Sequence, residues 1–262
     1  MYKPRVRNIR LVVEYDGTGL SGYQRQQNGP TVQQHLEEAL AKLLVHEVSV
    51  SGASRTDAGV HARAQVVLFH TERTIPLVGI RRGLNSMLPD SIAVRDASEV
   101  PDDFHPRFSA TGKHYRYTVL SAPDRSPRLR DRAWHVREPL DLAAMRAAAA
   151  VLVGQHDFAA FRAAGCSART TVRRIDTIDL TETPDGLLLI DVRGNAFLRN
   201  MVRILAGTLV DVGVGRLTAL QVGEILAAKD RTQGGRTAPP QGLELLEVFY
   251  DGSRVSSGLH RR

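Results

Sequence analysis

The sequence predicts an α+β fold made of two halves of similar order. Three observations lead to this prediction: alternating strand patterns, amphipathic helices between them, and a cluster of proline and aspartate at residues 100–106 that separates the halves. The first half is expected to run β-α-β-β-α-β, the ferredoxin-like pattern, and the second half to repeat that order. We therefore expect domains over residues 1–104 and 105–250. A basic tail at residues 251–262 is expected to be disordered.

The elements of the first half are predicted from local patterns. Residues 8–15 alternate and are rich in β-branched side chains, as a strand would be. Thr31 precedes Gln34 by three positions, which is typical of a capping box, and helical spacing of apolar residues then continues to Val45. Pro76 stands where a second helix can begin. The other strands are expected over residues 48–53, 65–70 and 92–97.

The second half is predicted in the same way. Aromatic residues alternate in its first strand, Asp141 precedes an alanine-rich helix, and a Pro-Asp-Gly turn joins two strands as a hairpin. Two further helices and a closing strand complete the pattern. The elements are expected over residues 113–120, 141–153, 172–181, 187–192, 197–212, 218–228 and 243–250.

The charge of the chain favours a nucleic-acid partner. The formal net charge is +7 and the sequence pI is about 10.0. All but four of the 35 basic residues are arginines, whose guanidinium groups bind phosphate oxygens in pairs and stack on bases. A genome rich in G and C would also produce many arginines, so composition alone leaves both explanations open.

Composition also argues against several classes of protein. The single cysteine, Cys166, excludes an internal disulfide and makes a cysteine-based zinc site implausible. No apolar run is long enough to cross a bilayer, and the first residues lack the apolar core of a signal peptide. A cytoplasmic protein with no membrane contact is therefore expected. Neither a phosphate-binding loop nor a dinucleotide-binding glycine pattern is present.

A polar, glycine-containing segment at residues 54–62 lies between two predicted strands. It is longer than a tight turn requires, and it would hold Asp57 at a strand end that opens toward a groove between the halves. By spacing alone, the segment is more typical of a turn in which Asp57 bonds local amides and Arg55 is solvated.

The residues of this segment resemble a known family. Arg55-Thr56-Asp57-Ala58-Gly59-Val60-His61-Ala62 is similar to the signature of the bacterial tRNA pseudouridine synthase A family. Similar blocks occur in the order of that family over residues 14–17, 22–26, 102–110, 115–117, 157–162, 195–203, 228–231 and 242–243. One block would be a weak match, whereas the ordered set is specific and spans nearly the whole chain.

The resemblance implies a fold, a reaction and partners. The fold would be two ferredoxin-like halves that share an extended antiparallel sheet, with the active-site cleft between them. The reaction would convert uridine to pseudouridine in the anticodon stem-loop of tRNA, at uridines 38, 39 and 40, after the base is flipped from its stack. A homodimer is implied as well. The reaction oxidises nothing and loses no group, so no cofactor and no metal is expected.

The resemblance also implies the site residues. Asp57 would be the catalytic carboxylate, and Arg203 the cation that keeps it charged in a partly dry cleft. Tyr115 would stack on the flipped uracil and is the third residue expected at the reacting centre. A solvated helix arginine and a half-buried strand face are the plainer alternatives for the last two. The residues expected to bind substrate are Tyr115, Arg55, Gln24, Arg25, His61, Asn195, Arg199 and Leu243.

Two other functions stay open at this point. A non-catalytic RNA-binding protein would explain the charge, since paired ferredoxin-like domains often bind RNA through aromatic residues of the sheet. A metal-dependent phosphodiesterase could use Asp57 and His61. The first does not explain the segment from Arg55 to Ala62, and unaltered activity in excess chelator would exclude the second.

Overall fold

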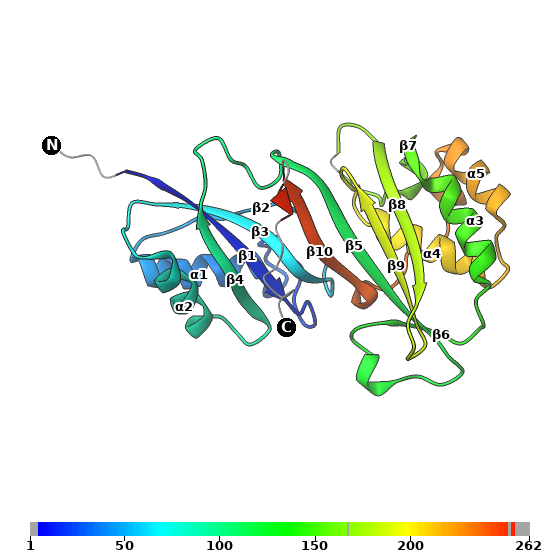
Figure 1. Cartoon of the computed structure of the whole chain (residues 1–262), viewed down its shortest axis with the longest axis horizontal. Coiled ribbons are helices and arrows are strands. Elements are labelled where there is room, and N and C mark those ends of the chain that lie inside the picture. Colours follow the sequence, from blue (N-terminus) through cyan, green and yellow to red (C-terminus); the bar gives the residue numbers. More distant parts are fainter. Residues whose placement is uncertain (1–4, 167, 251–252, 255–262) are drawn as a thin grey trace. The chain divides into compact units, whose positions relative to one another are not determined.

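A computed structural model of the chain describes residues 5–166, 168–250 and 253–254 (Figure 1). These residues form two compact units. Unit 1 comprises the described residues up to Thr111 together with those from Leu245 onward, and unit 2 comprises Gly112–Glu244. The sequence predicts the closing strand in the second half, but most of that strand belongs to unit 1. The units are therefore not two continuous stretches of sequence.

Unit 1 contains the helices and strands of the first half and the end of the chain. They are β1 (Arg7–Tyr15), α1 (Val32–Leu44), β2 (Ser51–Gly52), β3 (His61–Thr71), α2 (Leu77–Met87), β4 (Ile92–Glu99), β10 (Leu243–Tyr250) and β11 (Ser253–Arg254). The first six follow the predicted β-α-β-β-α-β order. Neighbouring strands run β4-β1-β3-β10, with β2 beside β3 and β11 beside β10. The pairs of β1 with β3 and β4, and of β2 with β3, are antiparallel.

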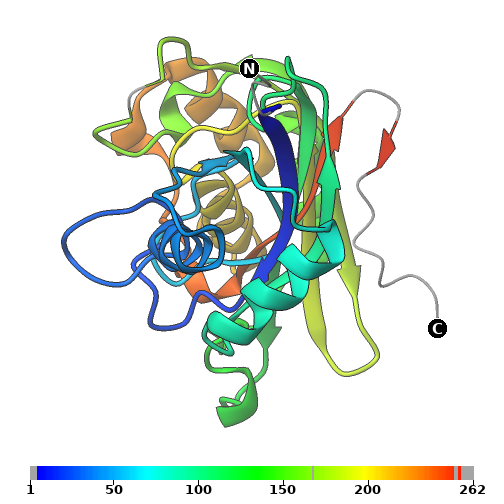
Figure 2. The same cartoon turned by 90° about the vertical axis from the view of Figure 1, so that its left-hand side faces the viewer.

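The core of unit 1 lies between its sheet and its two helices. Figure 2 shows α1 and α2 against one face of the strands. Alternate residues of β1 face that layer, and Ile9, Leu11 and Val13 are completely buried. Leu36 of α1 and Ile80 of α2 are also completely buried. The period-two pattern of the strand and the period-three-to-four pattern of the helices thus meet in one apolar layer.

Two local predictions in unit 1 need correction. The Thr31 hydroxyl accepts a hydrogen bond from the backbone N–H of Gln34, but the Gln34 side chain donates to Glu38 instead of closing the capping box. The strand predicted over residues 48–53 is reduced to Ser51–Gly52. The backbone of Val50 hydrogen-bonds to side chains of α1 instead of a neighbouring strand, which explains the shortening.

Unit 2 contains a sheet and three helices. Its elements are β5 (Ala110–Ser121), β6 (Trp134–Val136), α3 (Leu142–Leu152), β7 (Gly154–Asp157), β8 (Val172–Glu182), β9 (Leu187–Gly194), α4 (Met201–Gly213) and α5 (Ala219–Ala228). The strands are ordered β5-β9-β8-β7, and these neighbours are antiparallel. β6 adds a short parallel pairing to β5. The predicted hairpin is confirmed, with Gly186 at φ +79 in its turn.

The buried helix of unit 2 begins later than predicted. The sequence favours a helix over residues 197–212, whereas α4 begins at Met201. Asn200 adopts the left-handed conformation with φ 59, which a continuing helix does not allow. The chain before α4 instead makes a turn in which the N–H of Met201 donates to the carbonyl of Leu198 over 3.0 Å. α4 itself is largely apolar, and every residue in it except Arg203 is buried. Such a helix forms the centre of its unit.

The end of the chain also differs from the prediction. Disorder is expected from residue 251, but Ser253–Arg254 forms β11, which pairs with Phe249 and Tyr250 of β10. Residues 251, 252 and 255–262 lie outside the described residues. None of the helices described is long and apolar enough to cross a membrane.

Candidate active site

The predicted carboxylate, Asp57, lies on a loop of unit 1 whose backbone is held from two sides. The N–H of Val60 donates to the carbonyl of Asp57 over 3.1 Å and closes a turn around the residue. The N–H of Gly59 donates to the carbonyl of Leu20 over 3.3 Å. Asp57 itself is half-buried. The loop therefore fixes the backbone that carries the carboxylate while the side chain keeps access to solvent.

Thr56 anchors the other side of this loop. Its carbonyl accepts a hydrogen bond from the N–H of Tyr23 over 3.1 Å, and its hydroxyl lies 2.7 Å from the hydroxyl of Tyr15. Gly22 makes this approach possible: it has φ +92, and a Cβ there would lie 2.6 Å from the Thr56 carbonyl oxygen. The loop before Asp57 and the segment after β1 are thus locked together through main-chain atoms.

The entry to the loop is held by a side chain of β3. The amide of Gln65 bonds both the N–H and the carbonyl of Ser54, at 3.2 and 2.6 Å. Gln65 is completely buried, so this pair is shielded from water. Arg55, the next residue, is exposed. The loop therefore presents a guanidinium group to solvent two positions before the carboxylate.

His61 turns inward instead of toward solvent. Only 2% of it is exposed, and its Nδ1 accepts a hydrogen bond from the N–H of Gly17 over 3.0 Å. An Oδ1 of Asp16 also lies 3.1 Å from Nδ1, but that oxygen already accepts from the N–H and hydroxyl of Thr18. The imidazole is thus bonded from the main chain of the turn after β1. In this position it braces the turn after β1.

Gln24 and Arg25 lie on the exposed segment before α1. The Arg25 guanidinium donates to Glu37 over 2.9 Å, and its N–H donates to Gln33 over 3.0 Å, so α1 orients the residue. Arg25 also lines an open hollow of about 540 Å³, together with residues 26, 27, 29, 30 and 34. Four of its six lining residues have polar or charged side chains.

Tyr115 lies in unit 2 on β5. It is 5% exposed, and its ring meets the ring of Phe197 edge to face with 5.2 Å between centroids and an angle of 84°. The predicted helix over residues 197–212 would place Phe197 on a helix face. The turn before α4 instead brings it to Tyr115, an arrangement typical of stable aromatic pairs.

Arg203 lies in the first turn of α4, where hydrogen bonds hold its side chain. Its Nε donates to the carbonyl of Ala238 over 2.8 Å, and an Nη donates to the Asn200 side chain over 3.1 Å. The N–H of Ala238 donates in turn to the carbonyl of Arg203 over 3.0 Å. The guanidinium group is half-buried and oriented at two of its nitrogens. It is not the solvated helix arginine of the plainer alternative.

A buried tyrosine stands beside this arginine. The Tyr117 hydroxyl donates to the carbonyl of Pro239 over 2.8 Å, and the residue is completely buried. Burial raises the pKa of Tyr117, although the positive charge of Arg203 acts in the opposite direction. Gly242 packs against the ring so closely that a Cβ there would lie 2.7 Å from it. Tyr117 thus fixes the loop that holds Arg203.

The other predicted binding residues of unit 2 differ in their surroundings. Asn195 is exposed, and its side chain accepts from the N–H of Arg174 over 2.9 Å, which joins it to β8. Arg199 is exposed, and its carbonyl accepts from the N–H of Ala163 over 3.1 Å. Leu243 is 6% exposed at the start of β10. Arg199 therefore presents its charge to solvent, while the side chain of Leu243 is buried.

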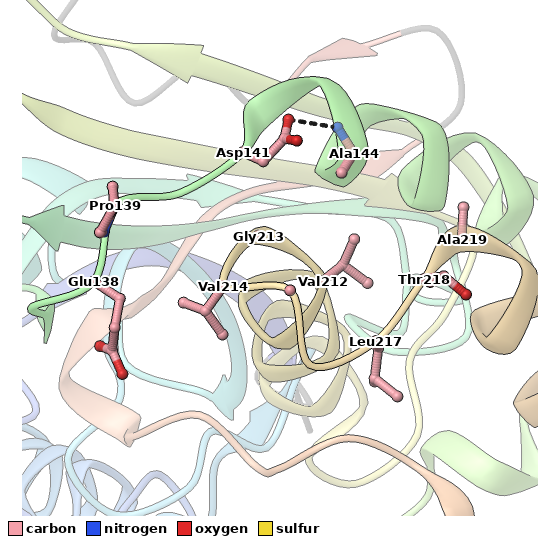
Figure 3. A pocket seen from close by; sticks show the side chains of 11 residues that line it. Glu138, Pro139, Asp141, Ala144, Val212, Gly213, Val214, Leu217, Thr218 and Ala219 are labelled. Atoms are coloured by element: carbon pink, nitrogen blue, oxygen red, sulfur yellow. Dashed lines mark hydrogen bonds between the residues drawn. The ribbon is translucent and has the colours of Figure 1, made fainter.

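A second hollow of about 540 Å³ in unit 2 is lined by none of the predicted site residues (Figure 3). It is lined mainly by carbon, at the start of α3 and α5 and the end of α4. Of the carboxylates that line it, Asp141 accepts from the N–H of Ala144 over 2.9 Å as a helix cap, and Glu138 pairs with Arg216 over 3.2 Å. No group of three or more metal-ligating side chains was found among the described residues.

Several residues that shape these sites were missed by sequence reasoning. Asn200 and Ala238 orient Arg203, and Tyr15 holds Thr56. Tyr15 and Asn200 fall within blocks that resemble the family, but no role was predicted from the sequence for any of the three residues. Ala238 lies 35 positions from Arg203 along the chain. The one available signal was Asn200 itself, since asparagine is enriched in the left-handed conformation that ends or begins a helix.

Comparison with known proteins adds a family. Residues 11–109 and 148–251 match the family described as tRNA pseudouridine synthase. The chain is 53% identical to tRNA pseudouridine synthase A of Citrifermentans bemidjiense, over 94% of this chain and 98% of that protein. It is 52% identical to the protein of the same description in Geobacter sulfurreducens, over 94% of this chain and 100% of the relative.

Similarity to solved structures is much weaker. The structure described as "Structure of H/ACA RNP bound to a substrate RNA containing 2'-deoxyuridine" gives a TM-score of 0.35 at 13% identity, over 77% of this chain and 44% of that chain. This likeness is too distant to inform the site.

Proposed function

We propose that this chain, which belongs to the tRNA pseudouridine synthase family, modifies uridines 38, 39 and 40 of the anticodon stem-loop. Asp57 is the proposed catalytic carboxylate. The family isomerises uridine to pseudouridine in tRNA, so the chain is an isomerase. The observation that carries the proposal is the fixed loop of Asp57. Leu20 and Tyr23 hydrogen-bond to the main chain of this loop, while Asp57 is half-buried.

The proposed chemistry needs one carboxylate and one base platform. The N-glycosidic bond of uridine breaks, the uracil turns, and the sugar rejoins it at carbon five, which then loses its proton. Asp57 can assist by adding to the uracil ring, by adding to the sugar, or by taking a proton from the sugar. Each route requires the carboxylate of Asp57 to be ionised. A nearby cation would favour that charged form, and Arg203 is the proposed cation.

Tyr115 and Arg203 are proposed to complete the centre. Support for Tyr115 comes from its edge-to-face contact with Phe197, which holds the phenol ring in one orientation and suits it to receive a flipped uracil. Support for Arg203 comes from its two hydrogen bonds, which limit the directions its guanidinium can take. We propose that the cleft between the two halves brings these residues to Asp57, as the family resemblance implies.

The remaining residues are proposed to bind or brace the RNA. Arg55, Arg25 and Arg199 are exposed cations suited to phosphate, and binding through them would weaken steeply with salt. Gln24, Asn195 and Leu243 are proposed as neighbours of the nucleotide. His61 is proposed to act indirectly, because its burial against Gly17 leaves it to position the loop of Asp57.

Architecture and assembly are also proposals. The neighbour order β4-β1-β3, with β2 on the far side of β3, supports a ferredoxin-like first half. From the family resemblance we propose a ferredoxin-like second half, an antiparallel sheet shared by both halves, and a homodimer. A cytoplasmic location is proposed as well. We propose the same two-domain organisation, with the closing strand assigned to the first domain because of its place in unit 1.

The experiment compares wild type with Asp57→Asn and Asp57→Ala. The substrates are three anticodon stem-loops, each with one uridine, at position 38, 39 or 40, tritiated at carbon five of the uracil. Wild type is expected to release tritium from all three, and both variants from none, while binding of the RNA persists in each variant. Release by Asp57→Ala at the wild-type rate would refute the role of Asp57. Release from only one stem-loop would refute the proposed set of uridines.

A further inference from the structure

The aromatic side chain of Phe108 is exposed to solvent. Its exposed fraction is 77%, whereas the other six phenylalanines are buried or half-buried. It follows β4, in a loop of unit 1 over residues 101–109 that we call the Phe108 loop. A single exposed apolar side chain is common on protein surfaces, so what distinguishes this ring is the rigid loop that carries it and the groups around it.

The Phe108 loop is closed on itself by hydrogen bonds. The Nδ1 of His105 accepts from the N–H of Arg107 over 3.1 Å and from the N–H of Phe108 over 3.3 Å. The N–H of Ser109 donates to the carbonyl of His105 over 2.9 Å, and the Ser109 hydroxyl accepts from the N–H of His105 over 2.9 Å. The backbone under the ring is therefore fixed before any partner binds.

The same loop is anchored to the sheet of unit 1. The Tyr250 hydroxyl of β10 donates to the carbonyl of Pro106 over 2.7 Å, and the Tyr250 ring packs on Phe104 with 5.1 Å between centroids. The side-chain amide of Asn8 in β1 donates to the carbonyl of Pro101 over 3.3 Å. Two strands thus hold the base of the loop, and the ring of Phe108 stands on a rigid support.

The surroundings of the ring are those of a stacking site. The His105 ring lies 4.4 Å from it at 37°, and the Arg107 guanidinium lies over its face at 5.7 Å. Even with both groups in place, 77% of Phe108 is exposed. Arg107 is exposed, and no ion pair to it was found among the described residues. We propose that Phe108 is a platform on which an unpaired base of tRNA stacks, with Arg107 adding its cationic face to the stack.

A base fits this surface better than a protein does. The exposed apolar area is a single ring with Arg107 and Ser109 as chain neighbours, whereas a protein interface needs a contiguous patch of several hundred Å². Asp103 is exposed in the same loop, and its charge disfavours phosphate groups. The contact would therefore be to the face of a base and not to the backbone. This inference rests on the proposed function only in requiring that tRNA is the substrate.

The test measures the Kd for an unmodified tRNA transcript in wild type, Phe108→Ala, Phe108→Trp and Leu220→Ala. Leu220 is the matched control, because it is 75% exposed and apolar but lies in unit 2. We expect Kd to rise about 5- to 150-fold in Phe108→Ala, the range for loss of one stacked base. Phe108→Trp should bind within twofold of wild type, with its added indole fluorescence quenched by tRNA. Leu220→Ala should not change Kd.

The outcomes separate this inference from the proposed function. If wild type releases no tritium from tRNA, the proposed function itself fails. If wild type is active and Phe108→Ala binds tRNA within twofold of it, only the stacking platform is overturned. A shift toward monomer in sedimentation velocity, caused by Phe108→Ala at unchanged Kd, would assign the ring to a contact between copies of the chain. Equal thermal midpoints of all four proteins verify that each is folded.

Discussion

The segments that carry Asp57 and Arg203 are held in place by different means. The loop of Asp57 is fixed by main-chain hydrogen bonds and by a close approach at Gly22, so its geometry depends on backbone atoms. Arg203 is oriented by hydrogen bonds of its own side chain to Asn200 and Ala238. Added bulk at Gly22 should therefore disturb the loop of Asp57, whereas loss of a hydrogen-bond acceptor should release the side chain of Arg203.

The largest expected effect is on the loop of Asp57. Gly22→Ala adds a Cβ that would lie 2.6 Å from the Thr56 carbonyl oxygen at φ +92. We expect the free energy of unfolding to fall by about 2–4 kcal/mol, from the backbone strain and the clash together. Urea denaturation measures it. The control is Gly19→Ala, which also has a positive φ, +75, but no atom within 4 Å of the added carbon. Equal losses in both variants would show that the close approach to Thr56 does not matter.

The next effect is on the orientation of Arg203. Asn200→Gly removes the acceptor that lies 3.1 Å from its guanidinium but keeps the left-handed backbone, which glycine adopts freely. A hydrogen bond to a charged group contributes about 1.5–3 kcal/mol, so we expect the rate of pseudouridine formation to fall about 10- to 150-fold with little change in stability. Single-turnover kinetics at saturating tRNA measure the rate. An unchanged rate would show that Asn200 is not needed to orient Arg203.

Alkaline pH should affect both units in the same way. Burial raises the pKa of Tyr23 in unit 1 and of Tyr117 in unit 2. In the unfolded chain each hydroxyl ionises near pH 10, so the folded chain keeps protons that the unfolded chain loses. Stability contributed by these groups is full below about pH 10 and is lost as pH rises above it. Each tyrosine adds about 1.4 kcal/mol per pH unit to that loss.

Denaturation of Tyr23→Phe at pH 9 and at pH 11 measures the contribution of one tyrosine. The variant should lose less stability between these two values than wild type does. The same loss in both proteins would mean that the Tyr23 hydroxyl reaches water in the folded chain.

The smallest effect separates the same two tyrosines at neutral pH. The Tyr117 hydroxyl donates to Pro239, whereas the Tyr23 hydroxyl is buried with no hydrogen-bond partner among the described residues. Tyr117→Phe leaves a buried carbonyl without its donor and should cost about 1 kcal/mol. Tyr23→Phe removes an unsatisfied group and should be neutral or stabilise by up to about 1 kcal/mol. Thermal unfolding of both variants tests this. A destabilised Tyr23→Phe would show that the Tyr23 hydroxyl is hydrogen-bonded in the folded chain.

Much of the fold was predictable because the signals are local. The caps at Thr31 and Asp141 lie three residues from the N–H groups they bond, and the hairpin turn at Gly186 lies within a few residues of both its strands. The predicted family was confirmed by the comparisons, since its ordered blocks are visible in the sequence without any structure. The start of α4 was not predictable in this way, because an apolar run shows no boundary until the conformation of Asn200 is known.

For this protein, the sequence alone determined the order of the first six elements of unit 1, the basic, arginine-rich composition, and Asp57 on a glycine-containing loop between two strands. These depend on interactions within a few residues or on composition. Only the tertiary structure decided that His61 is buried against Gly17, that Arg203 hydrogen-bonds to Ala238, and that Phe108 is exposed to solvent. The two partners lie 44 and 35 positions away along the chain. Such pairings form only when distant segments pack together, and no local pattern encodes which of them will meet.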